Sequence, residues 1–106
     1  MKTNTEMKKQ KSTRDIHAVM DAVSRATDVS VEKMLKPGRC VLRVVDARAI
    51  AIYLCSRRRV KGVDIAEAFG RSSPCVTHSC AKVEDRLLIR DKATASVVQK
   101  SEALLN

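Results

Sequence analysis

The chain has 106 residues, with 21 Lys or Arg against 12 Asp or Glu, which gives a formal net charge of +9 at neutral pH. This length suits one small domain and leaves little room for an enzymatic cleft, so we expect no catalytic activity. So large a surplus of positive charge favours nucleic acid as the partner over a membrane or an acidic protein, because binding a polyanion releases its condensed counterions.

The scarcity of aromatic residues indicates which kind of nucleic acid is the ligand. Tyr53 and Phe69 are the only aromatic residues, and Trp is absent. Proteins that bind single strands or unstacked RNA bases usually stack the bases on aromatic side chains. The composition therefore favours duplex DNA as the ligand.

The four cysteines, Cys40, Cys55, Cys75 and Cys80, include no CxxC pair. On a helix Cys75, His78 and Cys80 would point apart, by about 100° per residue, and could not converge on one ion. We expect no metal and no other cofactor, with Cys55 and Cys80 acting as small core residues in a reducing environment. No apolar run approaches a membrane span and the N-terminus lacks a signal-peptide core, so a cytoplasmic protein without membrane association is expected.

The chain begins with a polar, lysine-rich segment, residues 1–12, which is predicted to be a disordered basic tail before a helical domain over residues 13–106. A first helix is predicted from Thr13 to about Thr27, with Thr13 as its N-cap. Its apolar stripe consists of Ile16, Val19, Met20 and Val23. The short helix Val31–Lys36 follows, and Pro37 and Gly38 end it.

The longest apolar-rich stretch runs from Cys40 to Ser56. Its β-branched start also fits a strand, but helical spacing and many alanines favour a central helix from about Leu42 to Arg57. Because this helix is apolar on most sides, we expect it to form the core against which the others pack. Eight Lys or Arg residues stand against Asp46 alone between Lys36 and Lys61. Most of the excess charge therefore precedes the next pair of helices.

That next pair has the pattern of a helix-turn-helix. A bracing helix is predicted over Val63–Phe69, and Gly70 can end it because glycine adopts left-handed backbone at little cost. Ser72 and Ser73 can then accept hydrogen bonds from the first turn of a second helix, which runs to about Ile89 and has Pro74 in that first turn. In such motifs the N-terminal end of the second helix enters the DNA major groove.

A last helix is predicted over Ala93–Leu105. Its apolar stripe is weak, so it is interpreted as a loosely docked lid or a partner-binding segment. It is also the candidate face for a homodimer or another protein partner. The elements together predict an all-α bundle of about five or six helices that contains a helix-turn-helix.

Two stretches resemble the C-terminal DNA-binding domain of the bacterial replication initiator DnaA. They are VVDARAIAIYL at residues 44–54 and VDIAEAFGRSSPCVTHSCAKV at residues 63–83. In that family a helix of the form ARxIAMYL precedes an IGxxFG helix and the signature GGRDHTTVxHAxxKI. The resemblance can be followed from Ile16 to about Val83. It implies the fold of DnaA domain IV, which is similar to the Trp repressor, and a DNA-binding regulator of replication or transcription.

The resemblance also implies roles for individual residues. Arg71, Val76, His78 and Lys82 match the arginine, valine, histidine and lysine of the signature. Where the family has the base-reading Asp-His-Thr-Thr, this chain has Ser-Ser-Pro-Cys at residues 72–75, so we expect altered base recognition. Asp46 occupies a place where some members have an arginine that reaches the minor groove, and an acid there would repel phosphate.

From the pattern and the resemblance together we expect two sets of DNA contacts. The predicted base-reading residues are Arg71, Ser72, Ser73 and Thr77. The predicted phosphate-binding residues are Arg39, Arg43, Arg48, Lys61, His78 and Lys82. The alternative is a DnaA-like domain that has lost its base-reading residues and binds another protein, as an adaptor or antagonist.

Overall fold

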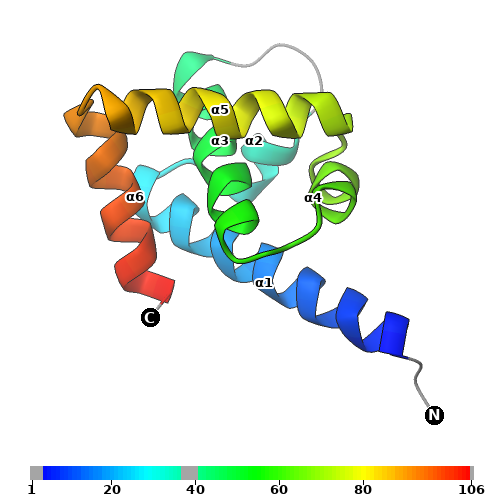
Figure 1. Ribbon diagram of the computed structural model, residues 1–106. Helices are drawn as coiled ribbons and strands as arrows, with labels where there is room; N and C mark the ends of the chain where they lie inside the picture. The colour runs from blue at the N-terminus through cyan, green and yellow to red at the C-terminus, as the bar shows by residue number, and fades with distance from the viewer. Residues whose placement is uncertain (1–3, 37–40, 106) are drawn as a thin grey trace.

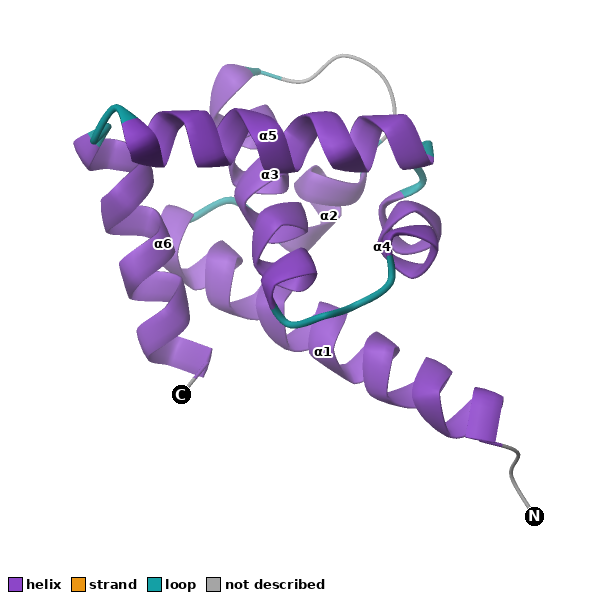
Figure 2. Cartoon of the chain, viewed as in Figure 1, coloured by secondary structure: helices purple, strands orange, loops and turns teal. Residues whose placement is uncertain are grey.

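The computed structural model describes residues 4–36 and 41–105, with side chains from residue 11 onward. Within these ranges the chain forms six helices and no strand, which confirms the predicted all-α class (Figures 1 and 2). The helices are α1 (Asn4–Thr27), α2 (Val31–Leu35), α3 (Leu42–Arg57), α4 (Gly62–Phe69), α5 (Ser73–Leu88) and α6 (Lys92–Leu105). In this part of the chain no helix is both long and apolar enough to cross a membrane.

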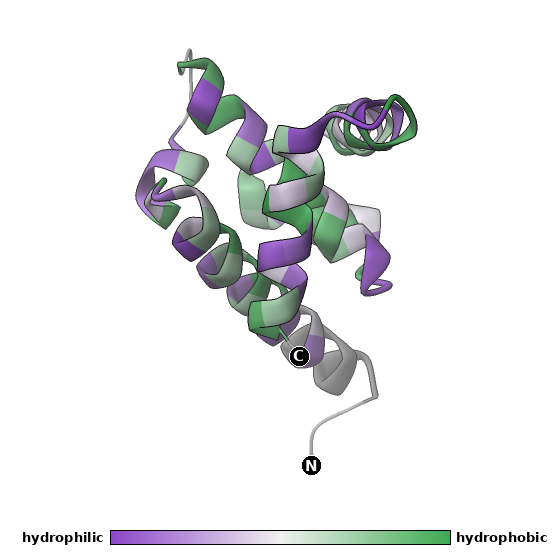
Figure 3. Ribbon diagram, turned by 90° about the vertical axis from the view of Figure 1, so that its left-hand side faces the viewer, coloured by the Kyte–Doolittle hydropathy of each residue, from purple (hydrophilic) through white to green (hydrophobic). Residues whose placement is uncertain are grey.

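Helix α3 lies at the centre of the bundle, as predicted. It packs against α1 on one side and α5 on the other, and it also contacts α2, α4 and α6. Its side chains from Ala47 to Cys55 are all buried, because the helix carries apolar residues on most sides. The outer helices are amphipathic by contrast, and Figure 3 shows hydrophobic and hydrophilic segments alternating along them.

The first helix begins at Asn4, nine residues before the predicted start at Thr13. The expectation of a disordered segment over residues 1–12 is therefore wrong from Asn4 onward. The stretch from Asn4 to Ser12 contains no Gly or Pro and is rich in Lys, Glu, Gln and Met, which are good helix formers. The apolar stripe of α1 is buried as predicted, with Ile16, Val19, Met20 and Val23 in the core. The proposed domain boundary at residue 12 stays a prediction.

Helix α6 packs along α1 more closely than its weak apolar stripe indicated. Thr94, Val98 and Ser101 of α6 are buried. Small side chains let two helices approach, so polar residues of this size serve as packing residues here. At the first turn of α6, the hydroxyl of Thr94 donates to Asp91 Oδ2 at 2.6 Å.

Among the described residues, four helix ends have left-handed backbone. Gly70 after α4 has φ of 62° and accepts this conformation at little cost. The other three are Asp28 after α1, Arg59 after α3 and Arg90 after α5, with φ of 60°, 64° and 59°. These residues carry a Cβ, so the same conformation costs each of them about 1–2 kcal/mol.

Candidate nucleic-acid interface

The turn between α4 and α5 has the geometry that the sequence predicted. Gly70 ends α4, and the N–H of Arg71 donates back to the carbonyl of Ala66 at 2.8 Å. Ser72 caps α5, because its hydroxyl oxygen accepts the N–H of Cys75 at 3.3 Å. Pro74 lies in the first turn of α5, where a helix needs no N–H donor. Glycine, serine and proline thus end one helix and begin the next within a few residues.

Helix α5 has one buried face, and this face fixes which residues point outward. Val76 and Val83 are buried against the core. Ser73, Thr77 and His78 are exposed on the N-terminal half of the helix. This half also has the positive end of the helix dipole, which favours an anionic ligand. The hydroxyl of Thr77 donates to the carbonyl of Ser73 at 3.4 Å and keeps its lone pairs for an outside donor.

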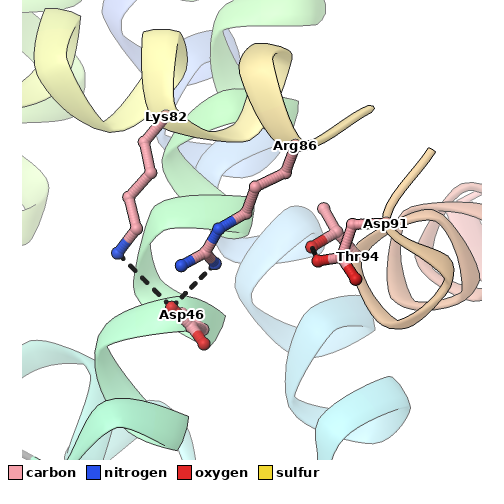
Figure 4. Close-up of polar contacts among 5 residues, drawn as sticks. All are labelled: Asp46, Lys82, Arg86, Asp91 and Thr94. Carbon is pink, nitrogen blue, oxygen red and sulfur yellow. Dashed lines mark hydrogen bonds and ion pairs between the residues drawn. The ribbon is translucent and has the colours of Figure 1, made fainter. Parts of the chain in front are cut away.

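The C-terminal half of α5 has a different electrostatic character. Glu84 and Asp85 are exposed there. Lys82 and Arg86 both turn toward Asp46 on α3, with distances to Oδ1 of 3.4 Å for Lys82 Nζ and 2.9 Å for Arg86 Nη1 (Figure 4). Two exposed acids and two partly neutralised cations make this half a poor surface for phosphates. A nucleic acid is therefore favoured only at the N-terminal half.

Two arginines bind the carbonyl end of α2. Arg48 is only 9% exposed, and its Nε donates to the carbonyl of Met34 at 2.7 Å. Arg48 and Arg71 both direct Nη2 to the carbonyl of Lys36, at 3.4 Å and 3.1 Å. Cations suit a helix C-terminus because the last carbonyls have no partner within the helix. So placed, Arg48 stabilises the fold and reaches no phosphate without leaving these carbonyls.

Arg71, the predicted base-reading arginine, is held at the same corner. It is half-buried, and its Nε is a buried atom without a hydrogen-bond partner among the described residues. An unsatisfied buried N–H weakens the folded-back position of this side chain. This missing hydrogen bond lowers the cost of moving Arg71 to a better acceptor near the N-terminal end of α5.

The other predicted phosphate-binding residues also differ in whether they already have a hydrogen-bond partner. Arg43 is exposed, but its Nη2 donates to the carbonyl of Thr27 at 2.6 Å, near the end of α1. Lys61 is exposed at the N-cap of α4. Arg39 lies outside the described residues. The structure thus brings Ser72, Ser73, Thr77 and His78 together at one helix end, while Lys61 lies at the far end of α4, on the turn that follows α3.

Sequence reasoning did not single out Arg86. Its spacing of four residues from Lys82 places both cations on one face of α5. This spacing was the sequence pattern from which Arg86 could have been identified. Which element faces them depends on how α5 packs against α3, and periodicity alone does not specify this. Asp46 accepts from both cations, and its expected repulsion of phosphate stays a prediction.

The cysteines divide between core and surface. Cys55 is fully buried, and this burial raises the pKa of its thiol to about 12. Cys80 is partly buried against the core, which raises its pKa as well. Both placements confirm the prediction of small core residues. In the part of the chain that the structure describes, no three His, Cys, Asp or Glu side chains gather as metal ligands would.

Residues 16–83 match the family described as the bacterial dnaA protein helix-turn-helix. The match includes α3, α4 and most of α5. The chain is also similar to the chromosomal replication initiator protein DnaA of Thermotoga petrophila, with 33% identity over 86 residues. The aligned part is 80% of this chain and 19% of that protein, so the chain spans about a fifth of the length of this relative.

Proposed function

Because the chain belongs to the bacterial DnaA helix-turn-helix family, we propose that it binds duplex DNA and regulates replication or transcription. The observation that carries this proposal is the exposed N-terminal half of α5, which presents hydroxyls and an imidazole at the positive end of a helix. In a helix-turn-helix this end lies in the major groove while the preceding helix braces it. The net charge of +9 supports the same ligand.

Base recognition is proposed to be altered relative to the family signature. Ser73 and Thr77 carry hydroxyls that can bond to several base edges, so they discriminate weakly. Ser72 uses one lone pair to cap α5 and keeps its O–H for an acceptor. Arg71 supplies the bidentate contact to guanine that sharp discrimination needs, once it leaves the carbonyl of Lys36.

Phosphates are proposed to lie against His78 on α5 and against Lys61 at the start of α4. Both are exposed, His78 on the N-terminal half of α5 and Lys61 at the start of the helix that precedes it. We propose a binding role without catalysis, since these groups supply cations and hydrogen bonds and no acid–base pair is evident in the sequence around His78.

The experiment that tests the proposal is selection of bound sequences from a random duplex pool, followed by binding of the winner against salt. Enrichment of one motif, with log affinity falling by about 0.9 per contacted phosphate for each log unit of salt, is expected. A steep slope without enrichment would instead identify a sequence-tolerant binder.

A charge introduced at the helix end makes the test specific to α5. Ser73→Asp places an acid in the first turn, which suits the helix dipole and keeps the fold, but it should abolish binding to the selected duplex. The matched control is Ser96→Asp on α6, where an exposed serine also lies near a helix start. Equal loss of binding in both variants would contradict the placement of the interface.

The alternative function, binding of another protein, is favoured by one observation. Leu88 and Ile89 are 79% and 78% exposed, side by side at the end of α5. Adjacent exposed apolar side chains of this size are typical of contact surfaces. Recovery of one protein in stoichiometric amount, together with no mobility shift on any duplex at low salt, would select this function over DNA binding.

A further inference from the structure

Asp46 holds two cations of α5 at once. Lys82 Nζ and Arg86 Nη1 approach the same oxygen, Oδ1, at 3.4 Å and 2.9 Å (Figure 4). The two cations are four residues apart on α5 and so share one face of the helix. The carboxylate comes from a different helix, α3, 36 and 40 positions earlier in the chain.

This cluster is partly exposed to solvent. The side chains of Lys82, Arg86 and Asp46 are 30%, 28% and 32% exposed. Ion pairs with this much exposure contribute little to stability, because water and salt screen them. The contact between α3 and α5 is carried instead by apolar residues such as Val76 and Val83, which are buried. The cluster thus adds to a contact that buried apolar residues already form.

The cluster also adjoins the proposed DNA surface. Lys82 is one helical turn from His78, which is exposed on the N-terminal half of α5. A carboxylate oxygen and a phosphate oxygen make the same charge-assisted hydrogen bonds to lysine and arginine. A DNA backbone that runs past His78 therefore meets two cations that already have an anionic partner.

We infer that Asp46 is an internal competitor for the DNA phosphate and limits the affinity of the domain for duplex DNA. This inference rests on the proposed function and adds the residue that sets its strength. In the natural chain Lys82 and Arg86 remain with Asp46 and contribute little to binding. Removal of the negative charge releases both cations to the phosphates.

The variant that tests this is Asp46→Asn. The amide keeps the size of the carboxylate and an oxygen acceptor, so the packing of α3 is preserved, while the charge is lost. The matched control is Asp21→Asn, which removes an acid of the same type from an ion pair on α1, where Arg25 Nε lies 3.2 Å from Asp21 Oδ2. Both variants raise the net charge by one, but only Asp46→Asn frees cations on α5.

Asp46→Asn should bind the selected duplex about tenfold more tightly at low salt. Its plot of log affinity against log salt should be steeper by one to two units, since each new phosphate contact adds about 0.9. Asp21→Asn should change the affinity less than about twofold, as expected for a charge far from the DNA surface. Arg86→Gln should leave the slope of the natural chain unchanged and should remove about one unit of the gain in the Asp46→Asn background. Circular dichroism and thermal unfolding verify that each variant is folded, and Asp46→Ser replaces Asp46→Asn if the latter does not fold.

The outcomes separate this inference from the proposed function. If the natural chain binds DNA and Asp46→Asn binds with the same or lower affinity at an unchanged slope, the inference is overturned and the proposed function stands. If Asp46→Asn binds and the natural chain does not, the inference holds and DNA binding by the natural chain fails. If neither binds at low salt, both fail.

Discussion

The cations that bind the end of α2 and those at the turn between α3 and α4 have opposite surroundings. Arg48 and Arg71 turn inward to the carbonyls of Met34 and Lys36. The second group, Arg57, Arg58, Arg59 and Lys61, is exposed to solvent. The carbonyl end of a short helix decides the difference, because its last carbonyls have no partner within the helix and accept from Arg48 and Arg71.

This contrast shows that net charge and available charge are different quantities. The chain has a formal net charge of +9. Arg43, Arg48 and Arg71 donate to backbone carbonyls, while Lys82 and Arg86 are paired with Asp46. The cations at the α3–α4 turn are exposed, so they are more available to a polyanion than these five bonded cations are. The formal net charge does not show this difference.

The largest effect is expected from a pair of arginine variants, one from each group. Arg48→Ala removes a buried, charged donor and leaves the carbonyl of Met34 unsatisfied, so the free energy of unfolding should fall by about 2–3 kcal/mol. Arg57→Ala, at an exposed site, should change it by less than about 0.5 kcal/mol. Urea unfolding measures both. Similar small losses would remove the distinction between the two groups.

A smaller effect is expected from the two glycines that adjoin these groups in the chain. Gly70 precedes Arg71 and has φ of 62°, and a Cβ built on it meets no atom within 4 Å. Gly70→Ala should therefore lower the free energy of unfolding by about 1–2 kcal/mol through backbone strain alone. Gly62 follows Lys61, has equally open space and lies in α4. Gly62→Ala should be neutral or stabilising by up to about 1 kcal/mol. Thermal unfolding compares them, and equal losses would show that the left-handed backbone at Gly70 does not set the cost.

The smallest effect is expected from the substitution of Lys61, and it concerns DNA binding. Lys61→Gln should reduce the salt slope by about one unit and weaken all duplex sequences alike, because a phosphate contact carries no sequence information. The control is Lys100→Gln on α6, which is also exposed and removes the same charge. Fluorescence anisotropy over a salt series measures both slopes. A change in sequence preference with Lys61→Gln would assign this residue to base contact instead.

Much of the fold could be predicted because helix formation and helix ends depend on neighbouring residues. The bounds of α3 were predicted correctly, and those of α4 and α5 to within one residue. Periodicity, Gly70 and the cap at Ser72 are local signals that act over one or two turns. The start of α1 was missed because a helix can continue on propensity alone, without an apolar face.

The candidate site was less predictable than the fold. The sequence identified the exposed residues of the N-terminal half of α5, since the apolar face of the helix fixes its opposite face. It could not show that Arg48 binds the end of α2 or that Asp46 faces Arg86, because both contacts depend on how separate helices pack. The availability of a charged side chain is a tertiary property, whereas its presence is a property of the sequence.

The left-handed residues at the ends of α1, α3 and α5 have a consequence for heat tolerance. Asp28, Arg59 and Arg90 each accept a backbone conformation that glycine would adopt with less strain. A gain of about 1 kcal/mol shifts the melting temperature of a domain of this size by roughly 4–8 °C. The domain can thus be made more heat-resistant at three helix ends without any change to the residues at the start of α5.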